Sequence, residues 1–259
     1  MARKSLKSAW ADSGTALGAW CVLPGSVHVE AIAGMGFDYV GIDAQHGLID
    51  EDMTLRMVQA VDLGSAAPIV RVPWNDPSLL GKVLDFGAAG AIIPMIGTAA
   101  DAERAVSACR YAPDGARSFG PTRVGLRDGP SYFAEANENI AVIPMIETRE
   151  ALDNLDDIVA VEGVDALYVG PFDLSVSLGL PPRNNDGTPA FDDALARVLD
   201  VCRNSGVIPA IHSDPRMAAK RLEQGFRMVT CAIDLAALYG GMKSALDTAS
   251  KVMGAPEKQ

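Results

Sequence analysis

Short apolar runs recur along the chain, and a stretch of mixed apolar and polar residues follows each of them. Eight such runs, five to seven residues long, are apolar throughout rather than alternating. This pattern is typical of strands that are buried on both faces of a parallel sheet. The predicted strands are 18–23, 38–43, 68–72, 90–95, 141–147, 166–171, 207–212 and 228–233.

The segments between the runs predict helices. "DAERAVSACRY" and "FDDALARVLDVCRNSG" are amphipathic, and a glycine often stands just before the next run, as in "GMGFDYVGID". Glycine commonly ends helices because it accepts the left-handed conformation. Strands alternating with helices over about 250 residues indicate an α/β fold, a (β/α)8 TIM barrel. We expect one domain over residues 1–259, with its core at about 15–250. A doubly wound open sheet is the alternative, but no G-x-G-x-x-G motif follows the first strand.

Two connections are long and rich in Gly, Pro, Asn and Asp, namely residues 111–140 and 179–190. Loops of this length often act as lids or binding loops. Arg117, Arg123 and Arg127 in the first connection could reach a distal carboxylate of a substrate, or they could lie in a solvated loop.

Composition narrows the class of partner. The formal net charge of −11 argues against nucleic acid or an anionic membrane as a partner. No run of 18 apolar residues exists, and no apolar segment follows the basic residues near the start. We therefore expect neither a membrane span nor a signal peptide. The four cysteines lack C-x-x-C spacing and are interpreted as reduced thiols of a cytoplasmic protein.

Polar residues close or follow most of the predicted strands. In a TIM barrel the carboxyl ends of all strands share one rim, where active sites lie. Two carboxylates on neighbouring strands repel each other unless a proton or a cation lies between them. Oxygen ligands without histidine or cysteine suit Mg²⁺ or Mn²⁺. The candidate site residues at the rim are Asp43, Gln45, His46, Arg71, Glu147, Asp173, His212 and Asp234.

Each candidate also has a structural interpretation. Glu147 and Asp173 each precede a helical stretch and could serve its first turn. A buried Arg71 needs an anionic partner, which could be a substrate or a rim carboxylate. His46 could be a hydrogen-bonded rim residue. Residues that we interpret mainly as structural are His28, Asp85, Met95, Met145 and His212.

Several longer motifs together resemble the HpcH/HpaI family of metal-dependent pyruvate aldolases, to which 4-hydroxy-2-oxoheptanedioate aldolase and 2-dehydro-3-deoxyglucarate aldolase belong. The likeness runs from about residue 15 to 250, and its most specific part is "YVGPFDLSVSLG" after "IET". The full set of motifs that carry it is "GIDAQHG", "RVPWNDP", "VLDFGAAGAIIPM", "RYAPDGARSFGPTR", "IPMIET" and "VEGVDALYVGPFDLSVSLG".

The resemblance implies a lyase that cleaves or forms the carbon–carbon bond of a 4-hydroxy-2-oxo acid, through a pyruvate enolate and an aldehyde. It implies that Glu147 and Asp173 hold a divalent ion, Mg²⁺ or Mn²⁺ with Co²⁺ as a further option. It also implies a cytoplasmic homohexamer, a trimer of dimers, whose C-terminal helix packs on a neighbouring subunit.

The resemblance assigns the remaining roles as well. Arg71 would lie at the keto oxygen, and His46 paired with Asp85 would move protons, within one chain or across an interface. Backbone N–H groups around Gly170 and Phe172 would hold the substrate carboxylate. The substrate-binding set is Arg71, Met145, Gly170, Pro171 and Phe172.

Three residues depart from the pattern of the better-known pyruvate aldolases. Met145 replaces a glutamine, Gln45 replaces a glutamate, and Phe172 stands where alanine is common. These changes leave the identity of the substrate open. Alternative functions are oxaloacetate decarboxylation, a bond-forming reaction like that of macrophomate synthase, a citrate-lyase-like reaction on a CoA ester, and a keto-acid sensor without turnover.

Overall fold

The computed structural model describes residues 5–252 and has eight parallel strands that close into a barrel. Each strand pairs with the next along the chain, and β8 pairs with β1. The prediction of a (β/α)8 barrel is therefore confirmed. The strands are β1 (Ala16–Cys21), β2 (Tyr39–Asp43), β3 (Ala67–Arg71), β4 (Gly90–Ile93), β5 (Ala141–Ile146), β6 (Ala166–Val169), β7 (Ile208–Ile211) and β8 (Met228–Ile233).

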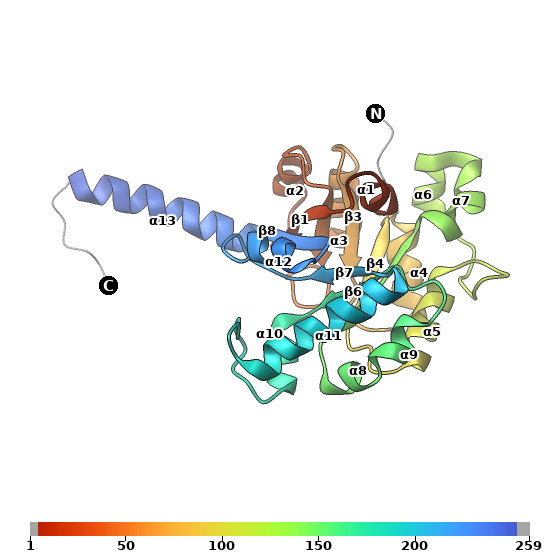
Figure 1. Cartoon of the computed structure of the whole chain (residues 1–259). Helices are drawn as coiled ribbons and strands as arrows, with labels where there is room; N and C mark the ends of the chain where they lie inside the picture. The colour runs from red at the N-terminus through yellow and green to blue at the C-terminus, as the bar shows by residue number, and fades with distance from the viewer. Residues whose placement is uncertain (1–4, 253–259) are drawn as a thin grey trace.

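Helices surround the barrel (Figure 1). The connections predicted as long loops differ: residues 111–140 contain two helices and a 3-10 turn, whereas 179–188 stay irregular. The helices are α1 (Leu6–Ser13), α2 (Ser26–Ala33), α3 (Glu51–Val61), α4 (Pro77–Asp85), α5 (Ala99–Cys109), α6 (Thr122–Asp128), η1 (Gly129–Ser131), α7 (Tyr132–Asn139), α8 (Arg149–Asp153), α9 (Leu155–Val159), α10 (Pro171–Ser177), α11 (Pro189–Ser205), α12 (Ala218–Gln224) and α13 (Asp234–Val252).

Side-chain oxygens fix where several helices begin after a strand. Asp50, Asp76, Thr98 and Thr148 each accept a backbone N–H from the first turn of the helix that follows. These bonds satisfy donors that the helix itself leaves unpaired. The local sequence thus ends each loop at a defined residue and keeps the rim loops short.

The barrel interior is one of two apolar cores. Trp20, Tyr39 and Tyr168 fill it, and Leu6 and Trp10 of α1 close its amino end. The second core lies between the strands and the surrounding helices. Because both faces of every strand are covered, the strands read as continuous apolar runs in the sequence.

Two glycines make room for the large interior rings. A Cβ atom on Gly18 would lie 2.1 Å from the Tyr39 ring, and one on Gly41 would lie 2.4 Å from the Trp20 ring. Gly18 and Tyr39 are partners in the β1–β2 register. Ring size and glycine position are therefore matched across neighbouring strands.

The connection between α5 and β5 lies at the amino end of the barrel. Arg117 pairs with Asp85 at the end of α4, and Arg123 and Arg127 both pair with Asp62 after α3. Helices of this fold end at the opposite side from the strand carboxyl ends. In this chain these arginines therefore do not reach the rim, which corrects the expectation that they could meet a distal substrate carboxylate there.

Helix α13 projects away from the barrel (Figure 1). Its exposed apolar residues fall on one face at helical spacing. They are Leu235, Leu238, Tyr239, Met242 and Leu246. Among the described residues, no helix is both long and apolar enough to cross a membrane.

Replacing Gly18 with alanine should destabilise the barrel, because the new methyl group overlaps the Tyr39 ring. Overpacking of this kind costs at least about 1–3 kcal/mol. Gly81→Ala is the matched control, since a Cβ there meets nothing within 4 Å. In the interior of α4 it should raise the free energy of unfolding by about 0.5–1 kcal/mol. Urea unfolding measures both variants, and equal stabilities would contradict this account.

Candidate active site at the carboxyl ends of the strands

An ion pair between Arg71 and Asp43 lies at the rim. The two residues are neighbours in the β2–β3 register. Arg71 Nε donates to Asp43 Oδ1 at 2.9 Å, and its Nη2 donates to Oδ2 at 2.6 Å. Burial alone would raise the pKa of Asp43, but the hydrogen bonds and charge of Arg71 outweigh it and hold that pKa below its ordinary value. Asp43 is therefore a carboxylate, and the anionic partner that Arg71 required is a residue of the same chain.

Trp20 orients this pair from inside the barrel. Its Nε1 donates to Asp43 Oδ2 at 3.3 Å, and the Arg71 guanidinium carbon lies 5.2 Å from the centre of its ring. A guanidinium over an indole face is attracted by the ring quadrupole. Planar contacts on two sides hold the guanidinium in one orientation.

Asp43 also shapes the turn that carries His46. Its Oδ1 accepts the backbone N–H groups of Gln45 and His46, each at 3.1 Å. The His46 side chain is exposed at the rim. One carboxylate therefore connects the arginine, the tryptophan and the turn with the imidazole.

Glu147 follows β5 and is only 2% exposed. Its Oε1 accepts the backbone N–H of Met95 at 2.8 Å. Met95 has φ of 57°, a conformation that non-glycine residues rarely adopt. Burial raises the pKa of Glu147, and the charge of Asp173 raises it further. A buried carboxylate with a like-charged neighbour favours the binding of a proton or a cation.

Gly170 allows the next strand to approach Glu147 closely. A Cβ at this position would lie 2.5 Å from Glu147 Oε2 and 2.9 Å from Met145 Cε. Asp173 lies in the first turn of α10, three residues further on, and is exposed. The space kept open by Gly170 and the two carboxylates beside it fit a hard divalent ion with oxygen ligands.

The predicted substrate-binding residues lie around this point. Met145 is 1% exposed and packs in the barrel interior, Pro171 is buried, and Phe172 is 55% exposed. The Gly170 N–H already donates to the Ile146 carbonyl at 3.4 Å. Phe172, as a first-turn residue of α10, has an N–H that no carbonyl within the helix accepts.

Asp85 lies at the other end of the barrel. It is the last residue of α4, and its Oδ1 accepts Arg117 Nη2 at 2.7 Å. His46 follows β2 at the carboxyl rim. The structure therefore does not bring His46 and Asp85 together within one chain.

His212 packs beside the ion pair at the end of β7. Its ring stands edge-on to Trp20 at 5.0 Å, and its Nδ1 lies 3.4 Å from the Tyr168 hydroxyl. Burial lowers the pKa of His212 to about 4, and the positive charge of Arg71 contributes. His212 is therefore neutral near pH 7, which agrees with the structural interpretation.

A second cluster at the rim consists of Cys21, His28 and Asp234, and their potential ligand atoms lie within 4.8 Å of one another. The Asp234 carboxylate already accepts the backbone N–H groups of Val22 and Leu23, and His28 Nε2 lies 3.3 Å from it. Burial raises the pKa of Cys21 strongly, so the sulfur stays a thiol. Thiolate is the form that binds metals. We therefore interpret the cluster as structural, because its hydrogen bonds join the β1–α2 loop to the start of α13.

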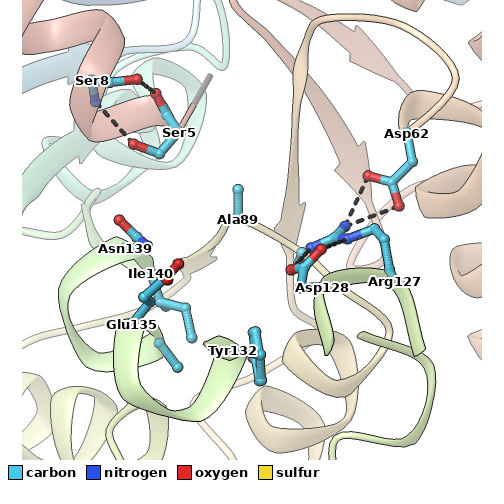
Figure 2. A pocket seen from close by; sticks show the side chains of 12 residues that line it. Ser5, Ser8, Asp62, Ala89, Arg127, Asp128, Tyr132, Glu135, Asn139 and Ile140 are labelled. Atoms are coloured by element: carbon cyan, nitrogen blue, oxygen red, sulfur yellow. Dashed lines mark hydrogen bonds and ion pairs between the residues drawn. The ribbon is translucent and has the colours of Figure 1, made fainter. Parts of the chain in front are cut away.

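The opposite end of the barrel is also hollow, with a cavity of about 570 Å³ beneath α1. Figure 2 shows Arg127 in its wall, bonded to Asp62 and Asp128, with Tyr132 nearby. A smaller cavity of about 80 Å³ lies at the carboxyl rim beside Phe172 and His212, so size does not identify the site. The polar residues that end the strands do.

The fold and rim together define a class of protein. This chain forms a closed (β/α)8 barrel. Where its strands end it presents a fixed guanidinium, a buried carboxylate with a raised pKa and an exposed imidazole. Enzymes with this fold have their active sites at that same end. The chain belongs to the HpcH/HpaI aldolase/citrate lyase family, whose sequence profile matches residues 17–239. The family predicted from the sequence is confirmed.

Individual relatives agree with this assignment. The chain is 40% identical to a hydroxypyruvate/pyruvate aldolase of Rhizorhabdus wittichii, covering 93% of this chain and 96% of the relative. It is 35% identical to a 4-hydroxy-2-oxo-heptane-1,7-dioate aldolase of Salmonella arizonae, covering 88% of each. The solved structure of macrophomate synthase superposes with a TM-score of 0.84 at 29% identity, covering 97% of this chain and 90% of that one. Both named aldolases are carbon–carbon lyases, the class of enzyme predicted from the sequence.

Sequence reasoning missed some of the residues that build the site. Trp20 looked like ordinary core, and nothing in the sequence marked the backbone N–H of Met95 as the partner of Glu147. Asp43 carried a signal, because it ends a strand adjacent to the one that ends in Arg71. Residues at the same level of neighbouring parallel strands can pair in this way.

Asp43→Asn should lower the free energy of unfolding by about 3–5 kcal/mol, because it leaves the mostly buried Arg71 without its anion. The pKa of Asp43 is depressed in the folded protein. Its stabilising contribution is therefore complete above the unfolded pKa of about 3.9 and is lost as pH falls through the folded pKa. Denaturant unfolding measures the free energy of unfolding of the wild-type protein and of Asp43→Asn. The difference between the two should stay constant from pH 8 to about pH 4 and should shrink between about pH 4 and pH 3. A difference that persists unchanged to pH 3 would contradict the ion-pair account.

Proposed function

We propose that this protein is a divalent-metal-dependent aldolase that cleaves and forms the carbon–carbon bond of a 4-hydroxy-2-oxo acid, with pyruvate and an aldehyde as the other reactants. The observation that carries this proposal is the buried carboxylate of Glu147, facing the gap at Gly170 beside Asp173. Family membership and the aldolase names of the relatives support it.

Glu147 and Asp173 hold the ion, Mg²⁺ or Mn²⁺ with Co²⁺ as a further option, because both offer hard oxygen ligands. When bound, a divalent cation supplies Lewis acidity toward a keto oxygen. Met95 holds Glu147 in place through its N–H, which leaves Oε2 on the side of Gly170.

Arg71 stabilises the negative charge that develops on the keto oxygen of pyruvate. Its guanidinium is fixed by Asp43 and Trp20 before substrate arrives, so little reorganisation is needed. The backbone N–H of Phe172 faces the substrate carboxylate, and Gly170 and Pro171 leave room for it. Met145 lines the floor with a thioether that donates no hydrogen bond.

His46 takes and returns the proton, because its imidazole is exposed at the rim and stands on a turn fixed by Asp43. Asp85 orients His46 from a second copy of the chain. His46 and Asp85 lie at opposite ends of one barrel. A direct hydrogen bond between them therefore requires an interface between two copies of the chain.

The likeness to macrophomate synthase, which shares the fold at 29% identity, leaves two related reactions as alternatives. The same residues would support a different bond-forming reaction of the enolate, or oxaloacetate decarboxylation, in which loss of CO₂ forms the pyruvate enolate and a proton then adds to its carbon. A citrate-lyase-like reaction on a CoA ester has weaker support, because the sequence shows no basic cluster for the nucleotide phosphates.

The enolate step is testable without knowing the aldehyde. Wild-type protein with Mn²⁺ or Mg²⁺ should exchange deuterium into the methyl group of pyruvate, followed by NMR. Glu147→Gln should reduce the exchange rate at least about 100-fold, and His46→Ala should reduce it about 10²–10⁴-fold. Glu162→Gln makes the same change at an exposed position and should leave the rate unaltered.

A chelator should abolish exchange, and added divalent ion should restore it. Exchange that is insensitive to chelator would exclude the metal role of Glu147 and Asp173. The absence of exchange with every divalent ion would exclude pyruvate as the nucleophile. Oxaloacetate consumption without aldehyde would favour the decarboxylase reading.

We further propose a homohexamer, a trimer of dimers, in the cytoplasm. The apolar face of α13 supports the assembly, because it lies exposed on a helix that projects from the barrel (Figure 1). Contiguous exposed apolar residues commonly mark protein–protein contacts. The thiols of Cys21, Cys109, Cys202 and Cys231 are all free, which suits a reducing compartment. Small-molecule reactants are the partners, with no role for nucleic acid or membrane.

Met242→Glu should shift the assembly toward single chains, because it places a charge in the apolar face of α13. Ser244→Glu adds the same charge on the opposite face and should leave the assembly intact. Analytical ultracentrifugation measures both. A wild-type protein that sediments as a monomer would contradict the proposal, as would equal effects of the two substitutions.

A further inference from the structure

The side chain of Arg117 is fully buried, although the residue lies in an irregular segment between α5 and α6. The backbone of this segment is tied to the end of α5. The Ala116 N–H donates to the Ser107 carbonyl at 2.8 Å, and the Arg117 N–H donates to the Arg110 carbonyl at 2.9 Å. Gly115 permits the close approach, because a Cβ there would lie 2.5 Å from the Ser107 oxygen. The fold therefore fixes the backbone from which the Arg117 side chain extends.

Two tyrosine rings flank the guanidinium of Arg117. Its carbon atom lies 4.5 Å from the centre of the Tyr111 ring and 5.7 Å from the centre of the Tyr132 ring. Burial raises the pKa of Tyr111 to about 12 and also raises the pKa of Tyr132. Both phenols therefore stay neutral near pH 7. Within residues 5–252, the anion that Arg117 meets is the carboxylate of Asp85.

This arrangement is costly for the folded protein. Within the described part of the chain, Nε and Nη1 of Arg117 have no hydrogen-bond partner, and neither do the hydroxyl groups of Tyr111 and Tyr132. Buried polar groups without partners lower stability, and replacing a buried ion pair with apolar residues is often neutral or stabilising. Stability alone therefore does not account for an arginine here, and the group that it holds becomes the point of interest.

Asp85 is held through one oxygen and is free at the other. Its Oδ1 accepts Arg117 Nη2 at 2.7 Å, whereas its Oδ2 accepts no hydrogen bond from residues 5–252. Asp85 also ends α4, where the helix dipole disfavours a negative charge. Arg117 compensates for that unfavourable position and leaves Oδ2 available to a further donor.

The surface around the free oxygen is apolar. Oδ2 of Asp85 lies 3.9 Å from the place of a Cβ on Gly120. Phe119, the preceding residue, is 67% exposed, and its ring stands edge-on to that of the half-exposed Phe133 at 5.5 Å. Exposed aromatic residues are common in contacts between subunits. A second copy of the chain that docks here would meet a carboxylate whose position is already fixed.

We propose that Arg117 is a positioning residue for the proton-transfer step. It fixes Asp85 through one oxygen, so that the other oxygen accepts the imidazole N–H of His46 in a neighbouring copy of the chain. The inference rests on the aldolase function proposed above, with His46 and Asp85 meeting across an interface. A carboxylate that is fixed before the chains meet orients the imidazole with little further loss of freedom.

The test uses mixed assemblies, in which two differently tagged chains are produced together and purified through both tags. Deuterium exchange into the methyl group of pyruvate with Mn²⁺ is the readout. Mixtures of His46→Ala and Asp85→Asn chains should exchange several-fold faster than the average of the two separate variants. The reason is that one chain supplies the imidazole and the other supplies Asp85 together with Arg117.

Arg117→Met is then added to one chain or to the other. On the His46→Ala chain it removes the arginine beside the intact Asp85, and it should reduce the regained rate at least about tenfold. On the Asp85→Asn chain it should leave the rate within about twofold, because no carboxylate is left there to position. The two mixtures contain the same substitutions. A purely structural role of Arg117 would lower both rates alike and would overturn the proposal.

Two further variants serve as controls. Arg110→Met removes another buried arginine at the end of α5, whose carboxylate partner is Asp165, and should give equal rates on either chain. Arg117→Lys keeps the charge but lacks the planar fork of the guanidinium. It should lower the rate about three- to tenfold on the His46→Ala chain alone, and it provides the same comparison if Arg117→Met does not assemble.

Exchange by the wild-type protein separates the two levels of inference. Wild-type exchange, with no gain in the mixed assemblies or no dependence on which chain carries the Arg117 substitution, would overturn the positioning role alone. The absence of wild-type exchange would overturn the aldolase function and the positioning role together.

Discussion

The pair of Arg71 and Asp43 is the interaction on which the rim depends. A guanidinium in the mouth of an apolar barrel needs a fixed anion, and β2 supplies it at the matching level of the neighbouring strand. The same carboxylate accepts N–H groups from Trp20 and from the turn that carries His46. Asp43 thereby neutralises the charge of Arg71, orients its side chain and fixes the shape of the loop that follows β2. The arginine is in place before any substrate binds.

Glu147 presents the opposite situation, a buried carboxylate to which no cationic side chain is bonded within residues 5–252. Its neighbours are a backbone N–H, the bare face of Gly170 and the like-charged Asp173. This arrangement is costly in an empty protein and favourable around a divalent cation. The contrast between the two carboxylates separates their roles, because Asp43 has its partner within the chain and Glu147 still needs one.

The loops and helices beyond the strands surround this rim with features particular to the chain. Similar proteins on the same barrel carry different names, a hydroxypyruvate/pyruvate aldolase and macrophomate synthase among them. In this chain Phe172, Asp214 and Met217 line a small cavity beside the ends of β6, β7 and β8. At the other end Asp85 is held by Arg117, and α13 extends outward with an exposed apolar face.

The sequence by itself determined the barrel, because strands buried on both faces must be apolar throughout and eight such runs were present. It also placed the polar candidates at one rim, since parallel strands end on the same side. It did not determine which candidates pair. The Asp43 anion for Arg71, the Met95 N–H on Glu147 and the capture of Arg117 by Asp85 join residues 28, 52 and 32 positions apart. Such contacts are set by strand register and by the folded path of loops, which only the tertiary structure decides.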